Sequence, residues 1–128
     1  MNLEEVAKRA GVSNAQVAGD TARAVRTLLG FGIEALVMTR GRNGAAIFGR
    51  DGSMVEAEPY PVEIYNTLGA GDSFAAGLLY GRLNGWDWRR SARMGNACGA
   101  IVVTRHGCAN HMLYEKEALE FVENRGGF

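Results

Sequence analysis

Apolar side chains recur at helical spacing in the first quarter of the chain. Within residues 13–32, small and apolar residues return every three or four positions, which is typical of an amphipathic helix. Ser13 precedes Gln16 by the three residues of a capping box at a helix start. The pattern therefore predicts a helix that begins after Ser13 and ends near Gly30 or Gly32.

The pattern then changes to short apolar runs of strand length. Residues 33–39 form one such run and predict a buried strand. Residues 44–50 and 52–58 form two more runs around Asp51 and Gly52, a residue pair typical of hairpin turns. A helix followed by strands indicates a layered α/β arrangement.

Three later segments predict helices. Residues 70–83 are apolar on nearly every side, so we expect this helix to be buried centrally. Asp87 is a favourable N-cap for a helix over residues 88–103, and residues 115–124 show a last amphipathic pattern. In the helix after Asp87 we expect three basic side chains in solvent, those of Arg89, Arg90 and Arg93. Three apolar side chains should face inward, those of Ala97, Ile101 and Val102.

Length, charge and cysteine content narrow the class of protein. A chain of 128 residues suffices for one compact core. The 14 basic and 14 acidic residues balance, which gives no electrostatic footprint for nucleic acid or an anionic membrane. No apolar run approaches the roughly 20 residues of a membrane span, and an acidic stretch rather than an export signal follows Met1. We therefore expect a cytoplasmic protein in which Cys98 and Cys108 are thiols.

The segment NTLGAGDSFAAGLLYG, residues 66–81, carries the most informative chemistry. At a helix start the first backbone N–H groups lack intrahelical partners and the helix dipole is positive, so such a turn binds anions. Gly69, Ala70 and Gly71 keep that turn free of bulk. Asp72 then has two interpretations: a residue that favours the helix dipole, or a general base that accepts the proton of a hydroxyl attacking a bound phosphoryl group.

This segment resembles the C-terminal signature of the ribokinase-like (PfkB) carbohydrate kinases, Asp-Thr-x-Gly-Ala-Gly-Asp followed by a helix of small residues. Other pieces follow the order of that family. They are NLEE at residues 2–5, TRGRNG at residues 39–44 and GNACGAIVVTRHGCA at residues 95–109. The resemblance covers essentially the whole chain and implies a ribokinase-like layered α/β fold. Within the family, residues 85–103 look most like the 5-dehydro-2-deoxygluconokinases of inositol breakdown.

The resemblance implies a role for each matching residue in transferring a phosphoryl group from Mg-ATP to a primary hydroxyl of a sugar or sugar acid. Asp72 would be the base, and the N–H groups of Gly69, Ala70 and Gly71 would form the anion hole. The resemblance also assigns the nucleotide contacts. Asn2 and Glu5 would stand near the phosphates, with Glu5 holding Mg²⁺ through water; Thr39, Gly41 and Gly44 belong to the nucleotide loop, and Asn96 would lie near the adenine.

Two features complicate this assignment. Asn2 and Glu5 taken alone fit helix-start capping equally well. Asn66 stands where the family usually has an aspartate of a monovalent-cation site, which puts potassium activation in doubt.

The resemblance is confined to the C-terminal, nucleotide-binding half of these kinases over residues 1–128. The sugar-binding half and its lid would be absent, so we expect little or no kinase activity from this chain alone. Self-association through an uncovered apolar face, or pairing with a complementary kinase half, is expected from the same reasoning. A nucleotide-binding module without catalysis is the alternative that the sequence leaves open.

Two other interpretations are weaker. Ala7 and Gly11 have helix-turn-helix spacing and resemble the start of a LacI-type repressor, but the following helix contains Asp20 and lacks a basic face for DNA. His106, Cys108 and His111 form a compact trio, yet a structural zinc site needs four ligands at stricter spacing. A loop beside the adenine is the favoured interpretation of that trio.

Overall fold

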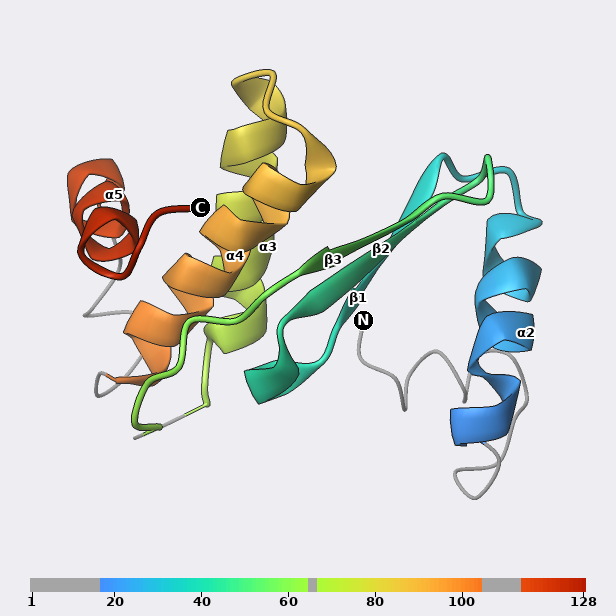
Figure 1. Ribbon diagram of the computed structural model, residues 1–128, viewed down its shortest axis with the longest axis horizontal. Coiled ribbons are helices and arrows are strands. Elements are labelled where there is room, and N and C mark those ends of the chain that lie inside the picture. The colour runs from blue at the N-terminus through green and yellow to red at the C-terminus, as the bar shows by residue number, and fades with distance from the viewer. Residues whose placement is uncertain (1–16, 65–66, 105–113) are drawn as a thin grey trace. The chain divides into compact units, whose positions relative to one another are not determined.

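The structure is a computed structural model that describes residues 17–64, 67–104 and 114–128. Its contacts divide the chain into two compact units. Figure 1 shows the helices and strands in order along the chain. The first unit comprises residues 1–41 and 45–56, and the second comprises residues 42–44 and 57–128. Several sequence-based expectations concern residues outside the described ranges: Ser13, Gln16, Asn2, Glu5, Asn66, His106, Cys108, His111 and the helix-turn-helix spacing.

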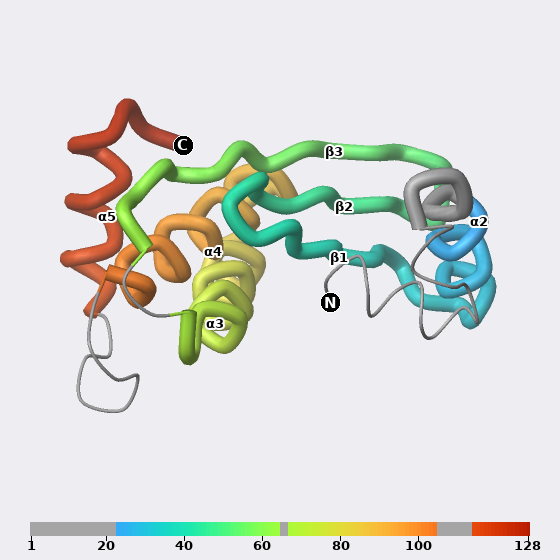
Figure 2. The backbone as a smooth tube through the Cα atoms, turned by 90° about the horizontal axis from the view of Figure 1, so that it is seen from below, coloured from blue at the N-terminus to red at the C-terminus, as the bar shows by residue number. Residues whose placement is uncertain are grey.

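The first unit contains a helix and a small sheet. Helix α2 spans Val17–Leu29, and strands β1 and β2 span Ala35–Thr39 and Ala45–Gly49. Strand β3, Met54–Ala57, begins in this unit. The sheet order is β1-β2-β3, with β2 in the middle (Figure 2), and β1 pairs with β2 antiparallel. The predicted helix end and all three predicted strands are confirmed.

Local chemistry sets the turn between β2 and β3. Gly52 has a φ of 88°, a left-handed conformation that side chains disfavour. The carboxylate of Asp51 accepts a hydrogen bond from the N–H of Ser53 at 2.9 Å, and the N–H of Gly49 donates to the carbonyl of Ser53 at 2.8 Å. The hairpin turn predicted at Asp51 and Gly52 is therefore confirmed.

The second unit is built on three helices. Helix α3 spans Ala70–Leu83, α4 spans Trp88–Val103 and α5 spans Glu115–Asn124, in agreement with the three predicted segments. The short 3₁₀ helix η2, Gly41–Asn43, lies where the two units join along the sequence. No helix among the described residues is long and apolar enough to cross a membrane.

Helices α3 and α4 approach each other closely because glycines line their contact. A Cβ atom at Gly77 would lie 2.7 Å from the carbonyl oxygen of Met94 and 2.8 Å from the Cα of Gly95. A Cβ atom at Gly81 would lie 2.7 Å from the Cα of Ser91. Only glycine leaves room for the neighbouring backbone at these positions.

Helix α4 is the centre of the second unit. Asp87 caps it by accepting a hydrogen bond from the N–H of Arg90 at 2.7 Å, which confirms the predicted helix start. Its apolar face packs on α5 and on Tyr60 in two buried clusters. Their buried members are Tyr60, Ala97, Ala100 and Val122 in one, and Met94, Cys98, Ile101 and Ala118 in the other.

Two expectations about burial were wrong. Helix α3 is not surrounded on all sides, because Leu79 and Leu83 are 59% and 86% exposed. The apolar composition of residues 70–83 does not indicate how many faces of the helix are covered by other residues of this chain. Arg93 is not in solvent: it is 9% exposed and its guanidinium donates to backbone carbonyls.

Candidate functional site

The candidate site begins at a glycine turn before α3. Gly69 occupies the N-cap position with φ of 82° and ψ of −2°, the left-handed conformation that glycine adopts without strain. No side chain within the described part of the chain donates or accepts a capping hydrogen bond at this helix start. The N-terminus of α3 therefore presents backbone donors at the positive end of its dipole that no side chain of the described residues caps.

The backbone donors of this turn differ in their availability. The N–H of Ala70 donates to the carbonyl of Thr67 at 3.2 Å, and the N–H of Ser73 donates to that of Gly69 at 3.0 Å. The N–H groups of Gly71 and Asp72 have no hydrogen-bond acceptor among the described residues. The anion hole expected from Gly69, Ala70 and Gly71 stays a prediction, and in this structure the N–H of Ala70 closes a tight turn with Thr67.

Space for an anion lies beside Gly71. A Cβ atom built on Gly71 would meet no atom within 4 Å, so the side of the turn at this residue is open. Asp72 lies in the first turn of α3 and is exposed. Two unbonded N–H donors and one exposed carboxylate therefore share a single helical turn. This arrangement can hold an anion and place a proton acceptor next to it.

Helix α4 supports the first turns of α3 from behind. A Cβ atom at Gly95 would lie 2.8 Å from the carbonyl oxygen of Phe74, whose ring is buried. At Gly99 the corresponding position is 3.4 Å from the carbonyl oxygen of Ala70. The start of α3 therefore rests directly on the backbone of α4, which restricts its movement.

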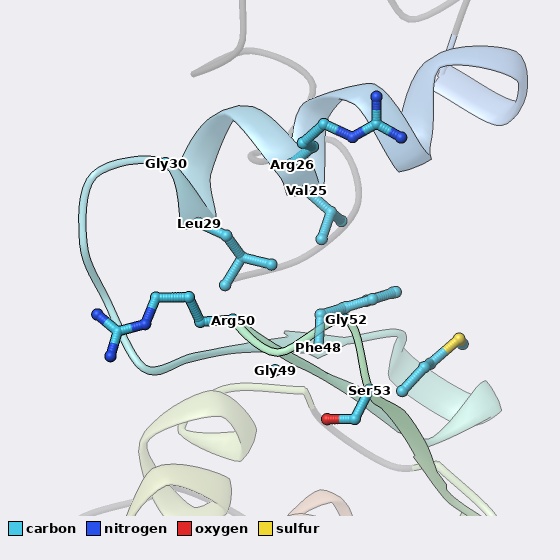
Figure 3. Close-up of a pocket in the computed structure, with 10 residues that line it drawn as sticks. Val25, Arg26, Leu29, Gly30, Phe48, Gly49, Arg50, Gly52 and Ser53 are labelled. Atoms are coloured by element: carbon cyan, nitrogen blue, oxygen red, sulfur yellow. The ribbon is translucent and has the colours of Figure 1, made fainter.

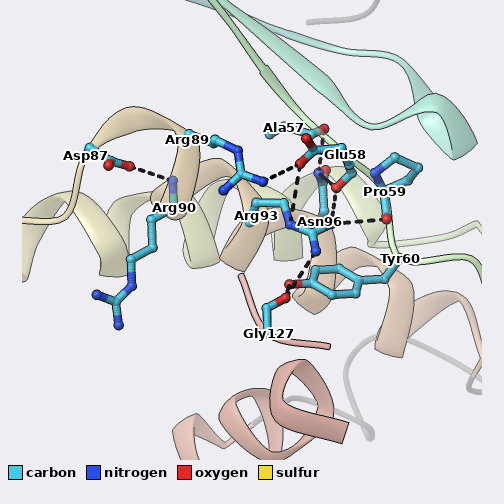
Figure 4. A network of polar contacts seen from close by, with 10 residues as sticks. All are labelled: Ala57, Glu58, Pro59, Tyr60, Asp87, Arg89, Arg90, Arg93, Asn96 and Gly127. Carbon is cyan, nitrogen blue, oxygen red and sulfur yellow. Dashed lines mark hydrogen bonds and ion pairs between the residues drawn. The ribbon is translucent and has the colours of Figure 1, made fainter. Parts of the chain in front are cut away.

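Two of the residues predicted to contact nucleotide meet at the carbonyl of Ala57. Gly44 has a φ of 85°, and a Cβ atom there would collide with that carbonyl oxygen. The side-chain amide of Asn96 donates to the carbonyls of Ala57 at 3.1 Å and Glu58 at 2.8 Å (Figure 4). The contact of Asn96 with adenine stays a prediction, and the amide oxygen is the atom left for it.

The remaining predicted residues are distributed as follows. Thr39 is the last residue of β1, where it pairs with Ala45, and Gly41 opens η2 with a φ of 57°. Both belong to the first unit, whereas residues 69–72, Gly44 and Asn96 belong to the second. The described residues contain no group of three or more acidic, histidine or cysteine side chains that could hold a metal ion. The assignment of Mg²⁺ to Glu5 thus stays a prediction.

Two features of the structure were not predicted from the sequence. One is a pocket of about 430 Å³ in the first unit, formed by α2 and the turn between β2 and β3 (Figure 3). It contains none of the predicted site residues and is lined by apolar and basic side chains that include Val25, Leu29, Phe48 and Arg50. No sequence motif marks this pocket. The other feature is the buried contact of Arg93 with residues 57–60, for which the only sequence signal is an arginine one helical turn before Asn96.

Comparison with known proteins relates this chain to a family of carbohydrate kinases. The family model described as pfkB family carbohydrate kinase matches residues 1–115. The 5-dehydro-2-deoxygluconokinase of Clostridium botulinum is 33% identical over 97 residues, which are 76% of this chain and 29% of that protein. The counterpart from Clostridium perfringens is 32% identical over 95 residues, 74% of this chain and 28% of that protein. The chain thus spans under a third of the length of the curated relatives it matches.

Solved structures agree on the fold. A putative ribokinase II from E. coli, in complex with ATP and Mg²⁺, has a TM-score of 0.74 and 32% identity, with 80% of this chain and 33% of that chain covered. Ribokinase from Thermotoga maritima has a TM-score of 0.74 at 22% identity, with 80% and 34% covered, a likeness of fold alone. The predicted ribokinase-like α/β fold is confirmed.

Proposed function

Because this chain belongs to the pfkB family of carbohydrate kinases, we propose that it forms the nucleotide-binding side of an ATP-dependent carbohydrate kinase. The turn at residues 69–72 carries this proposal. It combines a left-handed glycine, two unbonded N–H groups and an exposed carboxylate at one helix start. These are the groups that transfer of a phosphoryl group to a hydroxyl requires.

The turn fits the triphosphate of a nucleotide. Phosphate oxygens accept hydrogen bonds from backbone N–H groups, and the open space beside Gly71 lets them reach the donors of Gly71 and Asp72. Both donors also lie where the dipole of α3 favours negative charge. We assign the γ-phosphate to this turn because the carboxylate of Asp72 belongs beside the reacting group.

Asp72 accepts the proton in the proposed reaction. The hydroxyl oxygen of the acceptor forms a bond to the γ-phosphorus while the bond from that phosphorus to the bridging oxygen breaks and ADP leaves. The proton of the hydroxyl passes to the carboxylate of Asp72. The N–H groups of Gly71 and Asp72 offset the negative charge of the transferring group.

Mg²⁺ would supply positive charge that offsets part of the charge of the phosphates. Its proposed protein contact is Glu5 through water, with Asn2 nearby. The E. coli neighbour was solved with ATP and Mg²⁺, which supports this cofactor pair for the family fold.

The acceptor is proposed to be a sugar acid. The names of the matched relatives favour 5-dehydro-2-deoxygluconate, the substrate class of 5-dehydro-2-deoxygluconokinase. Since the matched residues make up only 29% of that relative, we place the sugar contacts in a part of the kinase that this chain does not match. We also propose that phosphoryl transfer requires a complementary part of the kinase that holds the acceptor, whereas nucleotide binding does not.

Calorimetric titration of the chain with Mg-ATP tests the proposal. The parent should bind, and Gly71→Val should abolish measurable binding, because its methyl groups would occupy the open space beside the two donors. Ala76→Val is the matched control, since it adds the same kind of bulk to an exposed position of the same helix. Equal affinity in the parent and Gly71→Val would refute the assignment of the turn, and a folded parent that binds no Mg-ATP would refute the proposed function.

A further inference from the structure

A buried arginine on α4 holds the backbone that follows β3. The guanidinium of Arg93 donates to the carbonyl of Glu58 and, at 3.1 Å, to that of Pro59 (Figure 4). Its other terminal nitrogen donates to the carbonyl of Gly127 at 3.1 Å. The guanidinium carbon also lies 3.8 Å from the ring centre of Tyr60. We call residues 57–60 the strap.

Asn96 holds the same strap one helical turn later. Because residues three apart lie on one face of a helix, Arg93 and Asn96 reach it together. Between them they bind three consecutive carbonyls, those of Ala57, Glu58 and Pro59. The far end is closed by Tyr60, whose hydroxyl donates to the carbonyl of Gly127 at 2.8 Å.

The strap connects to two residues of the predicted nucleotide site. Its first carbonyl, that of Ala57, is the atom against which Gly44 packs and to which the amide of Asn96 donates. The hydrogen bonds to carbonyls also fix the orientation of the Asn96 amide, with its nitrogen on the strap and its oxygen free to accept. A displaced strap would therefore release the amide of Asn96.

Burial of Arg93 is costly, which makes a purely stabilising role a weak explanation. Its Nε atom is buried without a hydrogen-bond partner among the described residues, and its Nε lies 3.8 Å from the carboxylate of Glu58. Apolar residues often replace buried charged groups at no loss of stability. An arginine does what they cannot: its planar fork donates in several fixed directions at once.

We infer that Arg93 is a positioning residue of the nucleotide site, acting through the strap on the side-chain amide of Asn96. The inference rests on the proposed function. Arg93 directs its two terminal nitrogens to three carbonyls. A lysine at this position keeps the positive charge but has only one nitrogen with which to reach them. It should therefore loosen the strap while the turn at residues 69–72 remains intact.

The experiment compares two ligands, Mg-ATP and inorganic tripolyphosphate with Mg²⁺, by calorimetry on the full chain. Arg93→Lys should weaken Mg-ATP about tenfold, the scale of one lost oriented hydrogen bond. It should leave tripolyphosphate within about twofold, because that ligand has no base for Asn96 to contact. Arg89→Lys is the matched control: Arg89 pairs with the Glu58 carboxylate at 2.8 Å on the surface and holds no strap carbonyl. It should change neither affinity.

Each outcome has one meaning. Unchanged Mg-ATP affinity in Arg93→Lys, or equal losses for both ligands, would overturn the inference, since the first denies positioning and the second indicates a general effect on the fold. Failure of the parent to bind either ligand would instead refute the proposed function, and the inference with it. Should Arg93→Lys not fold, Tyr60→Phe loosens the far end of the strap, and a ratio of ATP to tripolyphosphate affinity equal to that of the parent would then overturn the inference.

Discussion

The close approach of α3 and α4 gives a quantitative prediction at Gly77. In Gly77→Ala the new Cβ atom would lie 2.7 Å from the carbonyl oxygen of Met94, 2.8 Å from the Cα of Gly95 and 2.9 Å from the sulfur of Cys98. Carbon atoms pack best at about 3.5–4.0 Å, so the two helices must separate locally by roughly 1 Å. Overpacking of this kind costs about 1–3 kcal/mol in the free energy of unfolding.

A control separates this clash from the change in helix propensity. Gly99→Ala also replaces a glycine inside a helix, and its Cβ atom would make only an ordinary contact, 3.4 Å from the carbonyl oxygen of Ala70. Both variants gain about 1 kcal/mol of helix propensity. Gly99→Ala should therefore be stabilised by about 1 kcal/mol, and Gly77→Ala should be about 1–3 kcal/mol less stable than Gly99→Ala.

Urea unfolding followed by circular dichroism at 222 nm measures this difference. On the thermal scale the gap corresponds to about 4–12 °C in Tm, at about 4 °C per kcal/mol for a chain of this size. Equal unfolding free energies for Gly77→Ala and Gly99→Ala would refute the reasoning, because they would show that α3 and α4 have room for a methyl group at Gly77.

Three further predictions follow from single contacts. Asp87→Ala should lower the free energy of unfolding by about 1 kcal/mol in urea titration, since it removes the cap on the N–H of Arg90, and an unchanged midpoint would contradict the capping role. Burial raises the pKa of the Cys98 thiol from 9.0 to about 11 in the folded chain. Because the folded chain keeps this proton between pH 9 and 11 while the unfolded chain loses it, the contribution of Cys98 to the free energy of unfolding is present below pH 9 and is lost as the pH rises from about 9 to 11. The free energy of unfolding of Cys108→Ser should fall between about pH 9 and 11. The double variant with Cys108→Ser and Cys98→Ala should lack the part of this fall that comes from the Cys98 thiol. Asp72→Ala should leave the calorimetric Mg-ATP affinity of the chain within about threefold. In an assembly that transfers the phosphoryl group to an acceptor, it should lower kcat by about two to four orders of magnitude, and unchanged turnover would contradict the proposed role of Asp72 as base.

Local signals predicted the elements of this fold well. The helix at residues 70–83, the cap at Asp87 and the hairpin turn at Gly52 depend on residues close in sequence, and the structure has all three where they were expected. The glycines within residues 66–81 served two purposes that sequence alone does not separate. Gly69 shapes the turn, whereas Gly77 lets another helix approach.

Properties that depend on distant segments were not predicted. Arg93 lies among arginines that suggest a solvent face, but its partners come from residues 58, 59 and 127. The exposure of Leu83 likewise depends on what packs against α3 and not on its own sequence. At the candidate site, the motif located the turn, but the hydrogen bond from the N–H of Ala70 to the carbonyl of Thr67, and the lack of an acceptor for Gly71 and Asp72 among the described residues, depend on backbone geometry.

The most direct test of the central claim is the amide nuclear magnetic resonance spectrum of the chain titrated with Mg-ATP. If the turn at the start of α3 binds the triphosphate, the amide protons of Gly71 and Asp72 should shift downfield and saturate together, because both become hydrogen-bonded to phosphate oxygens. Gly85, at the opposite end of α3, should not shift. Saturable shifts elsewhere in the folded chain with Gly71 and Asp72 unmoved would contradict the account.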